Sequence, residues 1–173
     1  QISDIEESGT TLIENSFIKA RTVHKATGLP SLADDTGLEV DALSGAPGVF
    51  SARYAGKNAT FNDNINKLLK ELEGVPDEKR TARFRTVVSF VDQSRELYTE
   101  GIVEGLITLE QRGSDGFGYD PIFLPRNHEL TFSEMDLAVK NKISHRGKAL
   151  MKMKQLLQPY FEKGEDIGKI GIS

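Results

Sequence analysis

Two adjacent carboxylates, Asp34 and Asp35, stand before Thr36 and Gly37 in a chain of 173 residues. Adjacent carboxylates repel each other, so one of them needs a cation or a proton. A hard divalent cation such as Mg²⁺ takes oxygen ligands of this kind. Two carboxylates after a strand and before a glycine turn sit where α/β proteins place ligands, although Asp-x-x-Gly is also common turn chemistry. The motif therefore predicts either a metal-assisted site or a solvated acidic turn.

Acidic residues near the start of the chain are candidates to join this cluster. Glu6 and Glu7 precede Glu14 and Asn15 by a turn or two, and together these residues could complete a metal shell. The alternative is ordinary negative charge at a helix N-terminus, which the helix macrodipole favours. Lys19 shares a helix face with Asn15. Facing an acidic cluster, its ammonium can neutralise a polyphosphate, while in isolation it would be an ordinary surface lysine.

A glycine-rich loop with two aromatic residues occupies 113–121 (GSDGFGYDP). Glycines let a backbone approach a ligand closely, and Phe117 or Tyr119 can stack on a planar ring. The spacing matches neither the dinucleotide-binding fingerprint nor a phosphate-binding P-loop. We favour a ligand-binding loop here over an irregular loop with buried aromatic side chains.

Basic residues cluster at 140–148 (KNKISHRGK). Ser144 is a candidate N-cap, so the helix after it offers backbone N–H donors, with Lys140, His145 and Arg146 beside them. This combination suits a phosphate or a carbonyl-rich base edge, and the alternative is a basic surface patch before a helix. An acidic cluster, a basic cluster and a glycine-aromatic loop can bind Mg²⁺, phosphates and a base. Together they describe a nucleoside triphosphate site without a P-loop.

Helices are predicted where apolar residues recur at helical spacing. A capping box at 11–14 begins a helix over 11–27, and a second helix begins after its cap at Thr60. A short helix is expected after a cap at 133–136, and the last helix runs over 145–160. These helices carry two of the three clusters.

Strands are predicted from runs of β-branched and aromatic residues. Residues 38–41 alternate like a strand after the acidic turn. Residues 82–92 and 96–110 form a long antiparallel hairpin, in which Gly101 and Gly105 suggest bulges or a bend. This order of elements around one core predicts a single α/β or α+β domain.

Composition excludes several classes of protein. The chain has 22 Lys and Arg against 26 Asp and Glu, a net charge of −4, which does not support a strongly basic nucleic-acid binder. It has no cysteine, so disulfides, thiolate zinc sites and cysteine nucleophiles are excluded. No apolar run approaches the length of a membrane span, and no signal-like segment follows Gln1. We therefore expect a cytoplasmic protein with no nucleic-acid and no membrane partner.

Four segments together resemble the inosine triphosphate pyrophosphatase family. They are 31–41 (SLADDTGLEVD), 45–54 (GAPGVFSARY), 116–121 (GFGYDP) and 143–147 (ISHRG), and the residues from Glu14 to Arg21 are similar to the family's first helix. Several signatures in the family's order are far more specific than any one of them. The resemblance implies Mg²⁺-dependent hydrolysis of nonstandard purine nucleoside triphosphates (ITP, dITP and XTP) to the monophosphate and pyrophosphate. Such an enzyme cleanses the nucleotide pool.

The resemblance also implies a fold and an assembly. The family fold is α/β, an elongated mixed sheet with flanking helices and two lobes around a central cleft, and it is usually a homodimer. Residues 1–162 would form one nucleotide pyrophosphatase domain, and 163–173 would be a disordered tail. The family's first strand and its Ser/Thr-Gly-Asn-x-x-Lys phosphate loop have no counterpart in this sequence. We therefore expect that N-terminal phosphate-binding segment to be missing.

Roles for single residues follow from the resemblance. Asp35 would be the catalytic carboxylate, activating water or holding Mg²⁺, and Glu7 would be a second metal ligand. Phe117 would stack on the base, and His145 and Arg146 would read its 6-oxo group. The remaining implied substrate contacts are Thr36, Lys19 and Lys140, the two lysines on phosphates, with Gly118, Tyr119 and Asp120 shaping the wall beside the base.

Two other functions stay open at this point. The chain could be a nucleotide-binding or interaction module without turnover, which a missing phosphate loop favours, or a pyrophosphatase for other modified nucleotides. The presence of Glu7, Lys19 and Asp35 argues against the first, and the His145–Arg146 pair favours 6-oxo purines over the second.

Overall fold

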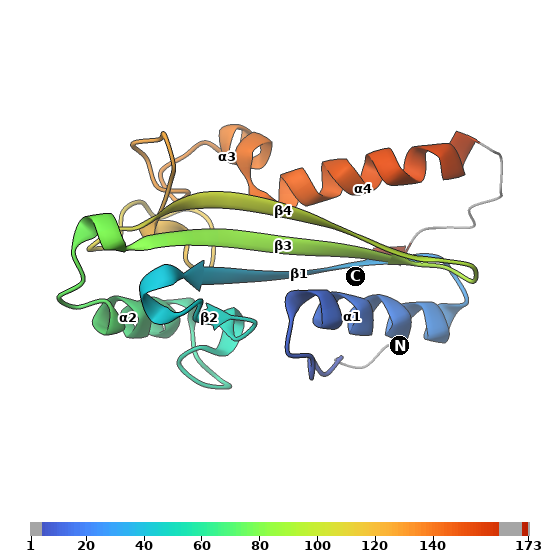
Figure 1. Cartoon of the computed structure of the whole chain (residues 1–173), viewed down its shortest axis with the longest axis horizontal. Helices are drawn as coiled ribbons and strands as arrows, with labels where there is room; N and C mark the ends of the chain where they lie inside the picture. The colour runs from blue at the N-terminus through green and yellow to red at the C-terminus, as the bar shows by residue number, and fades with distance from the viewer. Residues whose placement is uncertain (1–4, 163–170, 173) are drawn as a thin grey trace. The chain divides into compact units, whose positions relative to one another are not determined.

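A computed structural model describes residues 5–162 and 171–172 (Figure 1). Within them the chain forms two compact units. Of the described residues, unit 1 comprises 5–36, 86–101, 145–162 and 171–172, and unit 2 comprises 37–85 and 102–144. The three longest strands, at 31–40, 81–91 and 96–107, run through both units. Each unit therefore contains only part of each of these strands.

The sheet has the strand order β2-β1-β3-β4-β5, with β6 paired to β1. β1 and β2 are antiparallel, as are β4 and β5, while β1 and β6 are parallel. The strands are β1 (Ser31–Val40), β2 (Pro47–Gly48), β3 (Thr81–Val91), β4 (Glu96–Ile107), β5 (Phe123–Pro125) and β6 (Gly171–Ile172). The described chain is therefore a mixed α/β fold, as the order of its elements predicts. The expected two lobes around a cleft stay a prediction.

In unit 1, two helices cover opposite faces of the strands (Figure 1). α1 (Leu12–Thr27) packs its Ala20 against Val91 of β3, while α4 (His145–Glu162) packs its Met153 against Val88 and Phe90. Successive side chains of a strand point to opposite faces, so covering both faces of β3 in unit 1 buries consecutive residues. This explains why residues 86–91 are all buried.

In unit 2, the amphipathic helix α2 (Phe61–Glu71) buries Ile65 and Leu68 in a core shared with Phe84 of β3. Arg80 lies at this core and is buried, with only 3% of its surface exposed. Its guanidinium donates hydrogen bonds to three carbonyls, those of Leu72, Ile107 and Thr108. Since a buried cation is tolerated only with its donors satisfied, Arg80 fixes the end of α2 against β4.

The predicted helices are largely confirmed. α1 begins after Thr11 with the expected capping box, and α2 begins after Thr60 with a second one. The predicted hairpin corresponds to β3 and β4. The last helix extends two residues beyond the predicted end, to Glu162. Among the described residues, no helix is both long enough and apolar enough to cross a membrane.

The expected turn at residues 34–37 is wrong, because β1 begins at Ser31 and passes through this segment. Alternate residues of the strand, among them Ala33 and Asp35, are buried. The pattern Asp-Asp-Thr-Gly resembles a turn only when read alone. Here its neighbours on both sides are extended, and packing on both faces of the strand overrides the local preference.

The short helix α3 (Leu137–Ile143) begins later than its predicted cap. Asp136, rather than Ser133, occupies the N-cap position. Ser133 is buried, and its hydroxyl donates a hydrogen bond to the carbonyl of Asp115. Of the predicted tail at 163–173, residues 171–172 form β6, and the rest lies outside the described residues.

The two glycines of β4 allow close packing of backbone against backbone. A Cβ on Gly101 would lie 1.9 Å from the carbonyl oxygen of His145, and one on Gly105 would lie 2.4 Å from that of Leu124. Their interpretation as bulges or a bend misses this role. Gly101 thereby sets how closely the first turn of α4, which carries His145 and Arg146, approaches β4.

We expect Gly101→Ala to lower the free energy of unfolding by about 3 kcal/mol, because backbone must move to admit the methyl group. Urea denaturation followed by circular dichroism measures the loss. Gly28→Ala is the control, since Gly28 has a positive φ of 71° but open space around its Cβ. It should cost about 1 kcal/mol through backbone strain alone. Equal losses in the two variants would contradict the close-packing role.

Candidate functional site

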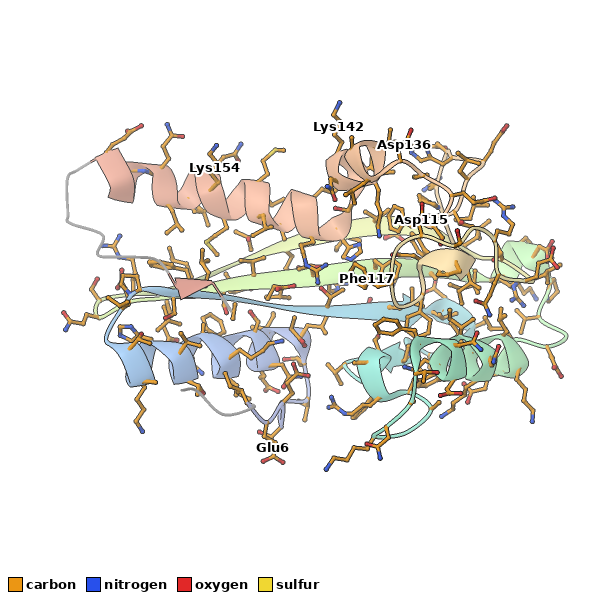
Figure 2. All side chains as sticks on the ribbon, turned by 180° about the vertical axis from the view of Figure 1, so that it is seen from behind. Glu6, Asp115, Phe117, Asp136, Lys142 and Lys154 are labelled. Atoms are coloured by element: carbon orange, nitrogen blue, oxygen red, sulfur yellow. The ribbon has the colours of Figure 1, made fainter. Side chains whose placement is uncertain are left out.

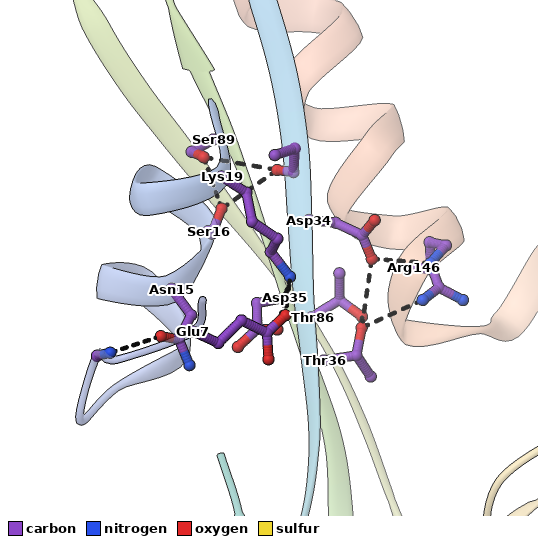
Figure 3. Close-up of polar contacts among 12 residues, drawn as sticks. Glu7, Asn15, Ser16, Lys19, Asp34, Asp35, Thr36, Thr86, Ser89 and Arg146 are labelled. Atoms are coloured by element: carbon purple, nitrogen blue, oxygen red, sulfur yellow. Dashed lines mark hydrogen bonds and ion pairs between the residues drawn. The ribbon is translucent and has the colours of Figure 1, made fainter. Parts of the chain in front are cut away.

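A lysine ammonium lies between two carboxylates in unit 1 (Figure 3). Lys19 Nζ is 2.9 Å from Glu7 Oε1 and 2.8 Å from Asp35 Oδ1. Lys19 belongs to α1, Asp35 to β1, and Glu7 to the segment before α1. The structure thus brings together three of the predicted site residues from three separate segments of the chain.

The segment before α1 is held by side chains of the helix itself. Glu14 Oε2 accepts hydrogen bonds from the backbone N–H groups of Thr10 and Thr11, and Asn15 Oδ1 accepts one from Gly9 N at 2.8 Å. The side chain of Glu14 therefore caps the N-terminus of α1. Figure 2 shows Glu6 pointing away from the protein, whereas its neighbour Glu7 contacts Lys19.

Burial and nearby charges shift the titration of this cluster. Burial raises the pKa of Asp35, and the charge of Glu7 adds to that effect. The hydrogen bond and the positive charge of Lys19 oppose it, but the pKa remains above its ordinary value. Burial lowers the pKa of Lys19, yet its hydrogen bonds to Asp35 and Glu7 outweigh burial and leave the pKa raised. Lys19 therefore stays a cation at neutral pH, and Asp35 holds a proton more readily than an ordinary aspartate.

The donor set of this cluster fits Mg²⁺. Glu7 and Asp35 each place a carboxylate oxygen within 3 Å of Lys19 Nζ, so oxygens of two carboxylates lie close to one another. Among the described residues, no group of three or more His, Cys, Asp and Glu side chains is arranged to hold a metal. Mg²⁺ usually takes only one or two carboxylates together with water and substrate phosphates. Glu7 and Asp35 match that requirement.

A second polar group lies on the opposite face of β1 (Figure 3). Arg146 Nε donates to Asp34 Oδ2 at 3.0 Å, and its Nη2 lies 3.5 Å from Thr36 Oγ1. The Thr36 hydroxyl in turn lies 2.7 Å from the hydroxyl of Thr86 on β3. The structure thus brings the predicted Thr36 and Arg146 together. His145 is 5% exposed at the start of α4, with its carbonyl against Gly101.

In unit 2, the glycine-aromatic loop presents Phe117 with 52% of its surface exposed (Figure 2). The carboxylate of Asp120 holds the loop in place. Phe117 N donates to Asp120 Oδ2 at 2.8 Å, and Lys140 Nζ lies 2.5 Å from the same oxygen. A Cβ on Gly116 would lie 2.4 Å from that oxygen, so only glycine permits this turn. An exposed ring on a fixed loop is suited to stacking on a planar ligand.

Lys140 supports the loop more closely than the sequence suggests. It is only 8% exposed, and its Nζ lies 4.9 Å from the centre of the Phe117 ring. Tyr119 is buried too, and its hydroxyl donates to the carbonyl of Ser51 at 3.0 Å. Phe117, Gly118, Tyr119, Asp120 and Lys140 therefore lie together in unit 2. Their individual roles, including the expected contact of Lys140 with phosphate, stay predictions.

Sequence reasoning assigned no role to Thr86, Ser16 or Ser89. Thr86 and Ser89 are polar residues inside the otherwise apolar run of β3, and both are fully buried. Ser16 donates to Ser89 across the interface of α1 with the strand, with 2.6 Å between their hydroxyl oxygens. A hydroxyl buried within an apolar strand needs a hydrogen-bond partner. The presence of Thr86 and Ser89 among apolar residues was therefore the sequence signal that could have identified them.

Comparison with known proteins identifies the family. A model of the Ham1 family matches residues 1–156. The chain belongs to the Ham1 family. It is 51% identical over 160 residues to a dITP/XTP pyrophosphatase of Thermoanaerobacter pseudethanolicus, covering 92% of this chain and 81% of the relative. It is 53% identical over 155 residues to a protein of the same name in Bacillus licheniformis, covering 89% and 79% respectively.

Solved structures of Ham1 proteins share the fold. A HAM1 protein from Coxiella burnetii, 49% identical, superimposes with a TM-score of 0.86, covering 91% of this chain and 82% of that one. A nucleoside-triphosphatase, or dITP/XTP pyrophosphatase, from Mycobacterium abscessus is 40% identical with a TM-score of 0.77, covering 91% and 81%. The family resemblance seen in the sequence is confirmed. The expected missing N-terminal segment stays a prediction.

In this Ham1 protein we expect Lys19→Met to lower the free energy of unfolding by about 2 kcal/mol, because it leaves two converging carboxylates without their cation. Thermal and urea denaturation measure the change. Arg21→Met is the matched control, since Arg21 forms an exposed pair with Glu96 at 2.6 Å and should cost less than about 1 kcal/mol. A Lys19 variant as stable as the Arg21 variant would contradict this account of the cluster.

Proposed function

We propose that this chain hydrolyses dITP, XTP and ITP to the corresponding monophosphate and pyrophosphate, with Mg²⁺ as cofactor. The observation that carries the proposal is the convergence of Glu7 and Asp35 on Lys19, in a chain about half identical to proteins named dITP/XTP pyrophosphatase. The cytoplasmic location and the homodimer expected from the family resemblance stay predictions.

The reaction breaks the anhydride bond between the α and β phosphates, and water supplies the oxygen. Bound by Glu7 and Asp35, Mg²⁺ would offset the charge of the triphosphate and lower the pKa of water. Asp35 would accept the proton of the attacking water at a carboxylate oxygen.

Positive charge would hold the triphosphate in place. Phosphoryl transfer depends mostly on positioning and on neutralising charge. The ammonium of Lys19 already lies within 3 Å of both proposed metal ligands, so it would contact phosphate oxygens carried by the same metal. We assign Lys140 to the phosphates as well, and Thr36 to the substrate through its hydroxyl.

The base would be recognised by stacking and by hydrogen bonds at position 6. Phe117 would stack on the purine, with Gly118, Tyr119 and Asp120 fixing the loop that carries it. His145 and Arg146 would donate hydrogen bonds to the 6-oxo group of hypoxanthine or xanthine. Adenine carries an amino group there, so donor would meet donor. A site built around such a hydrogen bond rejects analogues that leave its groups unpaired.

The first test measures pyrophosphate release from dITP, XTP and dATP with and without Mg²⁺. We expect Mg²⁺-dependent turnover of dITP and XTP well above that of dATP. Asp35→Asn should lower kcat by about 10³-fold, the range of a lost general base, and Mg²⁺ should raise the Tm of the parent protein but not of this variant. Asp41→Asn, a surface carboxylate paired with Arg83, is the control and should keep full activity.

An Asp35→Asn variant with parental turnover would overturn the assignment of that carboxylate. If the parent protein binds dITP and releases no pyrophosphate from any nucleotide, the chain is a nucleotide-binding module, the alternative function named above. Turnover of other modified nucleotides in preference to 6-oxo purines would correct the substrate alone.

The stacking role is tested by Phe117→Ala. We expect KM for dITP to rise about tenfold with a small change in kcat, since aromatic stacking on a base contributes about 1–3 kcal/mol. Phe61→Ala is the matched control, because Phe61 is also an exposed ring of unit 2, with 57% of its surface exposed. Equal KM values for the two variants would show that Phe117 only fills the loop.

A further inference from the structure

Asp34 is the one carboxylate of the acidic pair that the reaction leaves without a role. It lies on the opposite face of β1 from Asp35, because neighbouring side chains of a strand alternate (Figure 3). Its Oδ2 accepts the 3.0 Å hydrogen bond from Arg146 Nε. Asp34 therefore faces away from the cluster of Asp35, Lys19 and Glu7. It contacts Arg146, the arginine proposed to recognise the base.

The contact of Asp34 with Arg146 is part of a small network. Arg146 Nη2 and Asp34 Oδ2 each lie 3.5 Å from Thr36 Oγ1. The Thr36 hydroxyl is fixed in turn by Thr86, which is fully buried and 2.7 Å away. One edge of the guanidinium thus faces a carboxylate and a hydroxyl that are themselves anchored on two neighbouring strands.

An arginine side chain has four rotatable bonds and loses much rotamer freedom when it is fixed. Its guanidinium is planar, and its N–H donors keep a constant geometry within that plane. A contact at Nε and Nη2 therefore sets the plane and direction of the whole group. With one edge held, the orientation of the guanidinium is defined before any ligand arrives, and less order has to be imposed on binding.

We infer that Asp34 is a positioning residue for base selection, which holds the guanidinium of Arg146 in the orientation that reads a 6-oxo purine. The inference rests on the proposed function. Asp34 acts on discrimination between bases through Arg146 and takes no part in the transfer of the proton. Glu7 and Asp35 on the other face serve the phosphates, so the two neighbouring aspartates divide chemistry from selectivity.

The test compares kcat/KM for dITP and dATP in the parent protein, in Asp34→Asn, in Arg146→Ala and in the double variant. We expect Asp34→Asn to lower the dITP/dATP ratio about tenfold, because an amide oxygen accepts from Arg146 Nε without the charge that strengthens the contact of the carboxylate. The change should fall mainly on KM for dITP. In the Arg146→Ala background, Asp34→Asn should change the ratio no further, because its partner is gone.

Two controls separate this role from a general structural one. Glu96→Gln removes the carboxylate from another arginine pair of unit 1, the exposed pair with Arg21, and should leave the ratio unchanged. Asp34→Glu keeps the charge on a longer side chain and should restore part of the selectivity lost in Asp34→Asn. If Asp34→Asn does not fold, as judged by its melting transition, the comparison of Asp34→Glu with the parent carries the test, with a ratio lowered severalfold expected.

Each other outcome has a defined meaning. An unchanged ratio in a folded Asp34 variant overturns the inference. So does an equal loss of turnover on dITP and dATP, which would place Asp34 with the catalytic carboxylate, and so does a further loss of selectivity in the double variant. If the parent protein itself does not prefer dITP to dATP, the proposed base recognition fails, and the role inferred for Asp34 fails with it.

Discussion

The two-residue alternation of β1 is the constraint on which the candidate site depends. Because α1 and α4 cover opposite faces of unit 1, each side chain of residues 33–36 is committed to one helix or the other. Asp35 meets Lys19 of α1, and Asp34 meets Arg146 of α4. Two carboxylates that are adjacent in sequence thereby acquire opposite surroundings without any turn or loop. A shift of register by one residue would exchange the surroundings of the two aspartates. The packing of β1 therefore determines which carboxylate faces Lys19.

Charge balance follows from the same alternation. Adjacent aspartates would repel each other if they faced one common pocket. Each has its own cation here, since Lys19 lies 2.8 Å from Asp35 and Arg146 lies 3.0 Å from Asp34. The two pairs differ in burial. Asp35 has only 10% of its side chain exposed against 32% for Asp34, and this burial raises the pKa of Asp35. Burial, more than residue type, would distinguish the proposed proton acceptor from the proposed positioning carboxylate in this strand.

Much of the fold could be predicted from local patterns. The capping box at 11–14, the cap at Thr60, the long hairpin and the last helix are predicted from residue types at fixed spacing, because caps and apolar periodicity act over a few residues. The acidic segment was misread for the complementary reason. Asp-Asp-Thr-Gly favours a turn when considered alone, whereas the pairing of β1 within the sheet and the helices on both of its faces keep it extended. The roles of Gly101 and Gly105 were also invisible, since the groups they approach are distant in sequence.

The candidate site shows the same division. The sequence motifs predict Glu7, Lys19 and Asp35 as site residues, and the structure places them in one cluster. What the motifs do not encode is how such residues are supported. Asn15 holds the segment that carries Glu7, Thr86 holds Thr36, and Gly101 sets the position of the first turn of α4. These supports have ordinary residue types and no characteristic spacing, because their function lies in the single neighbour that each one contacts. A sequence pattern therefore reports the groups that do chemistry more readily than the groups that orient them. The motif identified Asp34 as a carboxylate beside Asp35, but it carried no sign of the contact with Arg146.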